Sequence, residues 1–178
     1  MRQLLLAITL AGCSSDRVTS NGAIPRTSSP TADVSASAPV HSVTGHGDLK
    51  PGPGFEFAPT IAIHQDATGR VWGRVITNII DLSTFGLSGK GEVIQEPVCM
   101  RVVGNTAYIG TVVVKTYDEN VYQVGERGVY WVQDGGKDGD DVAYGGPSWF
   151  WDPTNAICTS TPPQLPAVPV DHGAFIVR

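Results

Sequence analysis

Apolar and polar residues alternate in short runs from about residue 41 to the C-terminus. The runs are rich in valine, isoleucine and aromatic residues, and glycine, aspartate or asparagine separates them, which is typical of β-strands. No ten-residue stretch has the 3.6-residue apolar period of an amphipathic helix. The pattern predicts strands at 55–65, 69–79, 90–103, 106–117, 121–134 and 173–178.

Strands at this density predict an all-β domain, a small antiparallel barrel, with a β-sandwich as the alternative. Proline cannot donate a hydrogen bond to a strand ladder, so Pro59 predicts a bend or an edge position within the first run.

One hairpin can be placed residue by residue. Gly104 and Asn105 separate two apolar runs, and a two-residue Gly-Asn loop supplies the positive φ of hairpin turns. Pairing outward from this turn sets Arg101 opposite Tyr108 on one face. The other face is expected to point into the core, and it comprises Val98, Met100, Val102, Ala107, Ile109 and Val113.

The N-terminus has a different character. Arg2 precedes the short apolar run 4–8, which is too short for a membrane-spanning helix and is typical of an export signal. The run ends in Leu10-Ala11-Gly12-Cys13, which resembles the lipobox of bacterial lipoproteins. The resemblance implies cleavage after Gly12 and lipidation of Cys13, and two or three acyl chains give stable membrane attachment. Ser14, in place of an aspartate, favours the outer membrane where the cell has one.

Residues 14–40 are dominated by serine, threonine, alanine and proline and contain no aromatic residue. Such a segment cannot bury enough apolar surface to offset its ordering entropy. The predicted organisation is a signal peptide at 1–12, a lipidated cysteine and disordered tether at 13–40, and one β domain at 41–178. The formal net charge is −5, without a basic cluster, so no nucleic-acid partner is expected.

With Cys13 lipidated, Cys99 and Cys158 remain, and an oxidising exported setting predicts a disulfide between them. The bond would close a loop of about 60 residues and stabilise the fold by about 4 kcal/mol. It would fasten the proline-rich segment 153–169 to the hairpin. A reactive thiol or a metal site is the alternative.

A glycine-rich acidic loop spans residues 134–141. Calcium takes several oxygen ligands from a backbone that curls around it, but this loop lacks the fixed glycine and final glutamate of an EF-hand. A solvated turn is the alternative. The candidate calcium ligands are Asp134, Asp138, Asp140 and Asp141, and no other cofactor is expected.

Trp149, Phe150 and Trp151 follow that loop as an aromatic cluster. They either cap the core or form an exposed platform for a sugar or a partner protein. Together with Arg101 and Tyr108 they make up the candidate binding patch.

The hairpin also carries a motif. It reads Cys99-x-x-Val102-x-Gly104-Asn105-x-Ala107-x-Ile109-Gly110. This motif resembles a pattern in uncharacterised small β domains of secreted bacterial proteins. The stretches 132–136 and 173–177 stand where those domains have Val-x-Asp-Asn-Gly-Glu-Gly and a Gly-x-Phe-Val-Val ending, although Thr111 replaces a glycine of the pattern, and the Asn and Glu are lost. The resemblance covers 41–178 and implies a shared fold, with no activity to carry over.

These features predict a lipid-anchored envelope protein that presents a binding or structural module without catalysis. Its expected partners are the membrane, through Cys13, and an envelope protein or glycan. Small lipidated barrels that inhibit lysozymes have a similar plan, so a hydrolase inhibitor is one alternative. A glycan hydrolase is the other, and it needs two carboxylates across a cleft. The available acids include Glu56, Glu92, Glu96 and Asp152, which nothing in the sequence pairs.

Overall fold

The computed structural model describes residues 38–88, 90–137, 141–147, 156–159 and 166–178. The chain divides into two units, Met1–Ser35 and Ala36–Arg178, and every described residue belongs to the second. The predicted signal peptide, Cys13 and most of the predicted tether therefore lie outside the described residues.

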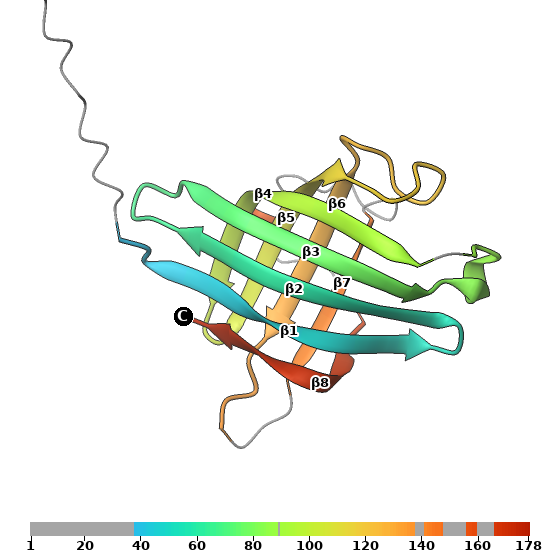
Figure 1. Cartoon of the computed structure of the whole chain (residues 1–178). Coiled ribbons are helices and arrows are strands. Elements are labelled where there is room, and N and C mark those ends of the chain that lie inside the picture. The colour runs from blue at the N-terminus through green and yellow to red at the C-terminus, as the bar shows by residue number, and fades with distance from the viewer. Residues whose placement is uncertain (1–37, 89, 138–140, 148–155, 160–165) are drawn as a thin grey trace, which may run out of the picture. The chain divides into compact units, whose positions relative to one another are not determined.

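The second unit is a closed antiparallel barrel of eight strands in sequence order (Figure 1). The strands are β1 (His41–Gly52), β2 (Phe55–Gln65), β3 (Val71–Asp81), β4 (Gly91–Val103), β5 (Thr106–Lys115), β6 (Arg127–Gln133), β7 (Val142–Pro147) and β8 (Val168–Val177). The described residues also form two short helices, η1 (Ser83–Phe85) and α1 (Ala156–Thr159). Because β8 pairs back onto β1, the predicted barrel is confirmed over the sandwich. Figure 1 shows β1, β2 and β3 crossing in front of the steeply inclined β5, β6 and β7.

Two strands were not predicted, and glycines account for both omissions. β7 carries two successive glycines, and β1 carries Gly45 and Gly47. Gly45 has a φ of 146°, and a Cβ placed on it would lie 2.1 Å from the carbonyl oxygen of Ala174. Gly173 of β8 has a φ of 102° and a similarly close approach, 2.2 Å, to the carbonyl oxygen of His46. The glycines that weaken the strand pattern of β1 thus let it bend against β8 and close the barrel.

Pro59 lies in the interior of β2, paired with Thr77 of β3, and its side chain is fully buried. The predicted edge position is wrong, because a closed barrel gives β2 a neighbour on each side. In the β1–β2 ladder, Thr60 and Phe57 are paired with β1 but the residues between them are not. The missing N–H of Pro59 therefore lies at a gap in that ladder.

Inward-facing side chains from all eight strands, together with Leu82 just after β3, form the core. This cluster comprises Val43, Leu49, Phe57, Ile61, Ile63, Val75, Ile79, Leu82, Val93, Met100, Ala107, Ile109, Val113, Tyr130, Val132, Ala143, Val168 and Phe175. Loop residues Tyr117, Val121 and Tyr122 pack against it. The buried apolar surface is the main source of stability of the barrel.

The Gly104–Asn105 hairpin has the predicted register, with Arg101 opposite Tyr108. One predicted core residue is wrong, because Val98 is 48% exposed. The register between β4 and β5 shifts between Pro97 and Cys99, so Val98 is an extra residue in β4. Such a bulge breaks the alternation of faces, and Gln95, only 3% exposed, points inward instead.

A chain of hydrogen bonds crosses the otherwise apolar interior. The Tyr130 hydroxyl lies 2.8 Å from the Thr77 hydroxyl and accepts a hydrogen bond from Gln95 Nε2 at 2.8 Å. Thr111 donates to Gln95 Oε1 at 2.5 Å. Buried polar groups are tolerated when each finds a partner, so this chain links β3, β4, β5 and β6 at one level of the barrel.

Tyr130 is expected to make the barrel sensitive to alkaline pH. Burial raises the pKa of Tyr130 to about 12 from the ordinary 10.0. The folded state therefore favours the neutral phenol, and its contribution to stability is complete below about pH 10 and lost as pH rises towards 12. The free energy of unfolding should fall by about 1.4 kcal/mol per pH unit in this window.

Urea unfolding of wild type and Tyr130→Phe across this range measures the effect. The variant should be less stable at neutral pH by about 2 kcal/mol, because Gln95 and Thr77 lose a partner. It should also show a shallower alkaline decline, and the remaining slope would report Tyr122, whose pKa burial also raises. Equal slopes in the two proteins would contradict the assignment.

Candidate functional site

The strand registers bring four large side chains into one line on the outside of the barrel. Arg101 of β4 lies opposite Tyr108 of β5, Tyr108 opposite Trp131 of β6, and Trp131 opposite Tyr144 of β7. The Arg101 guanidinium carbon stands 5.0 Å from the centre of the Tyr108 ring, within cation–π range. We call Arg101, Tyr108, Trp131 and Tyr144 the outer row. All four side chains are half-buried.

Two donors in the outer row have no hydrogen-bond partner among the described residues. They are Nε of Arg101 and Nε1 of Trp131, and both atoms are shielded from water. An unpaired buried donor costs about 1–3 kcal/mol. A ligand oxygen that reached either nitrogen after a small side-chain movement would therefore gain a hydrogen bond without displacing an existing one.

The sequence identified half of this row. The Arg101–Tyr108 pair follows from the tight turn between β4 and β5. Trp131 and Tyr144 were missed because an eleven-residue connection, residues 116–126, separates β5 from β6 and does not determine their register. Trp149, Phe150 and Trp151, the other members of the predicted patch, lie outside the described residues.

The predicted disulfide joins Cys99 of β4 to Cys158 of α1, beside the outer row. Cys99 shares the outer face with Arg101, two residues away. Its cross-strand partner is Gly110, where an added Cβ would lie 2.9 Å from the Cys99 sulfur and 3.6 Å from Ile157 Cγ2. Ile157 of α1 is fully buried although it lies outside the main core cluster. The absence of a side chain at Gly110 thus makes room for the disulfide and the helix on this face.

The acidic loop contributes two carboxylates that bind backbone amides. Asp141 Oδ1 accepts a hydrogen bond from Gly135 N–H at 2.8 Å, and its Oδ2 accepts one from Phe175 N–H at 2.5 Å. Asp134 accepts hydrogen bonds from the N–H groups of Gly136, at 2.7 Å, and Val177, at 3.1 Å.

These contacts close a gap in the barrel. β7 and β8 share only the pairs Val142 with Pro169 and Ala143 with Val168. Arg178 exchanges backbone hydrogen bonds with Ser42 of β1, so the alternate amides of β8 face away from β1. The two carboxylates take the place of a strand neighbour for those amides.

The structure thus gives Asp134 and Asp141 a structural task, while Asp138 and Asp140 lie outside the described residues. Within the ranges that are described, no group of three or more metal-ligating side chains comes together. Calcium binding by the four aspartates stays a prediction.

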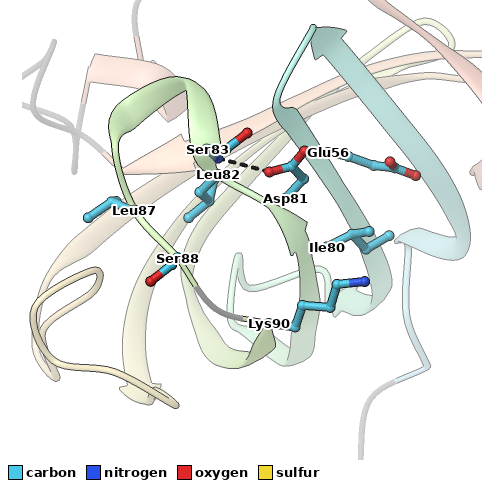
Figure 2. Close-up of a pocket in the computed structure, with 8 residues that line it drawn as sticks. All are labelled: Glu56, Ile80, Asp81, Leu82, Ser83, Leu87, Ser88 and Lys90. Carbon is cyan, nitrogen blue, oxygen red and sulfur yellow. Dashed lines mark hydrogen bonds between the residues drawn. The ribbon is translucent and has the colours of Figure 1, made fainter.

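A cavity of about 430 Å³ lies on the outside of the barrel near the end of β3 (Figure 2). We call it the loop pocket, and its lining residues are Glu56, Ile80, Asp81, Leu82, Ser83, Leu87, Ser88 and Lys90. Glu56 and Asp81 are partners across the β2–β3 ladder, although the sequence did not pair them. In Figure 2 the Asp81 carboxylate faces the Ser83 backbone. The Glu56 carboxylate points away from the Asp81 carboxylate.

Asp81 of the loop pocket does not have the electrostatics of a general acid. Hydrogen bonds from Ser83, and to a smaller extent the charge of Lys90, hold the pKa of Asp81 below its usual value. A general acid needs the opposite shift, which comes from burial or a neighbouring negative charge. Of the other acids, Glu92 forms an exposed ion pair with Lys115 and Glu96 one with Arg74, while Asp152 lies outside the described residues.

Within the described ranges, no helix is both long enough and apolar enough to span a bilayer. Comparison with protein-family models, with curated proteins and with solved structures found no match to this chain.

Proposed function

We propose that this chain is a lipid-anchored protein of the bacterial envelope whose barrel binds an envelope glycan on the outer row. Cys13 would carry the lipid, in a sequence that resembles a lipobox. The observation that carries the binding role is the outer row itself, in which three aromatic rings and one guanidinium lie side by side across four paired strands.

The chemistry of the row suits a sugar better than a charged ligand. Aromatic rings offer flat apolar faces, on which the C–H faces of a sugar ring can pack. Nε of Arg101 and Nε1 of Trp131, which have no partner among the residues that the structure describes, offer donors to sugar hydroxyls. Because the row belongs to four hydrogen-bonded strands, its rings are held on a rigid support, which lowers the entropy lost on binding.

Binding of purified bacterial cell-wall glycan to the full chain tests the proposal. Tyr108→Ala should weaken binding about tenfold, since one stacking surface and the cation–π partner of Arg101 are lost. Phe85→Ala is the matched control, because Phe85 is an exposed aromatic residue whose ring packs against Phe55, 5.1 Å between centres. It lies in η1, which precedes the start of β4, whereas Arg101 lies near the end of that strand.

Three results would reject the binding role: no retention of the chain on the glycan, an equal loss in both variants, or release of glycan fragments, which would instead indicate a hydrolase. Cell fractionation tests the anchor separately, and Cys13→Ser should move the chain from the membrane to the soluble fraction.

A further inference from the structure

The loop pocket presents opposite charges around an apolar surface. Glu56 comes from β2 and Asp81 from the end of β3, while Lys90 comes from the segment that leads into β4. Figure 2 shows the Lys90 amine at a distance along the pocket from the Asp81 carboxylate, with Ile80 between them. The apolar part of the lining consists of Ile80, the buried Leu82 and the half-buried Leu87.

The wall formed by η1 is held in place by several contacts. Thr84 N–H donates to the carbonyl oxygen of Gly54 at 3.0 Å, in the β1–β2 turn. The Phe85 ring packs edge-on against Phe55, with 5.1 Å between centres. Ser83 N–H donates to Asp81 at 2.9 Å, which orients this carboxylate. A pocket whose wall is fixed before binding loses little entropy when a ligand enters.

Glu56 remains available to a ligand although a lysine stands nearby. Lys50 Nζ lies 3.7 Å from Glu56 and only 2.9 Å from Asp171, and the three side chains are substantially exposed. Exposed ion pairs contribute little, and Lys50 keeps its closer partner when Glu56 binds another cation.

We propose that the loop pocket binds a short zwitterionic peptide. Its ammonium group would lie against Asp81, with the charge of Glu56 adding to the negative potential of that end, its carboxylate against Lys90, and an apolar side chain against Leu82 and Leu87. The volume of about 430 Å³ lies within the range of small-ligand sites. Charge-assisted hydrogen bonds at both ends would select a ligand that carries both charges at the right separation. This site is separate from the outer row, which lies on β4 to β7.

Calorimetric titration of the full chain tests the proposal with four probes. The zwitterionic dipeptide alanyl-leucine should bind at millimolar concentration or below. Its N-acetylated form lacks the ammonium and its C-terminal amide lacks the carboxylate, so each should bind about tenfold more weakly. Free leucine carries both charges on one carbon, and it should bind more weakly than the dipeptide because it cannot span the pocket.

Variants assign each charge to its end of the ligand. Glu56→Gln should weaken binding of the dipeptide about tenfold and leave binding of the N-acetylated form unchanged. Lys90→Gln should weaken binding of the dipeptide about tenfold and leave binding of the C-terminal amide unchanged. Glu96→Gln and Lys115→Gln, which remove exposed charges outside the pocket, are the matched controls and should change nothing. Absence of dipeptide binding, equal binding of all four probes, or equal effects in pocket and control variants would overturn the proposal.

Discussion

Replacing Asp141 with alanine is expected to lower the free energy of unfolding by about 4 kcal/mol. The carboxylate accepts hydrogen bonds from the N–H groups of Gly135 and Phe175. Each hydrogen bond to a charged group contributes about 1.5–3 kcal/mol, and alanine offers no replacement acceptor. These two hydrogen bonds lie where β7 and β8 share only two residue pairs, so the closure of the barrel depends on them.

Urea unfolding measures the global loss, and hydrogen exchange locates it. The Phe175 amide should lose protection in Asp141→Ala, whereas the amides of β2 should keep theirs. Asp171→Ala is the matched control, because Asp171 is an aspartate of β8, the strand that carries Phe175, and its side chain is 45% exposed in its ion pair with Lys50. The control should change stability by less than about 1 kcal/mol. Equal losses in the two variants would show that the backbone contacts of Asp141 contribute nothing special.

Removing the disulfide is expected to have a similar effect. Cys99 and Cys158 are separated by 59 positions, and closing a loop of this length restricts the unfolded chain by about 4 kcal/mol in the chain-entropy description. The double variant Cys99→Ser/Cys158→Ser should be less stable than wild type by about this amount. Loosening of α1 would add to the loss by exposing Ile157, which is fully buried.

Reduction of the wild-type protein provides an independent measurement of the same bond. A thiol reductant should lower the stability of wild type to that of the double variant and leave the variant unchanged. Gly110→Ala should destabilise the oxidised protein more than the reduced one, because the added Cβ would lie 2.9 Å from the Cys99 sulfur. Insensitivity of wild type to the reductant would rule out a stabilising role for the disulfide.

Local signals in the sequence were sufficient for a large part of the fold. β2 has the predicted bounds, because an uninterrupted apolar alternation marks both of its ends. The β4–β5 register followed from the two-residue turn at Gly104, which leaves only one pairing. The disulfide followed from the cysteine count and the expected exported setting, with Cys13 expected to carry the lipid.

The candidate sites depended on relations that no local signal records. Trp131 joins Tyr108 through a register set by long-range packing, and Glu56 meets Asp81 only because β2 and β3 pair over their full lengths. Val98 was assigned to the core by strict alternation, which a single extra residue in β4 is enough to break.

By itself, therefore, the sequence determined an all-β domain, its best-marked strands, one hairpin register and the cysteine pair. Side-chain alternation and turn chemistry act over a few neighbouring positions, and a cysteine count needs no geometry. Only the tertiary structure decided that β8 closes onto β1, that Asp134 and Asp141 replace a missing strand neighbour, and that the outer row and the loop pocket exist. Each of these joins residues far apart in the chain, and the free energy that selects them comes from burial and hydrogen bonding that arise only when the whole barrel closes.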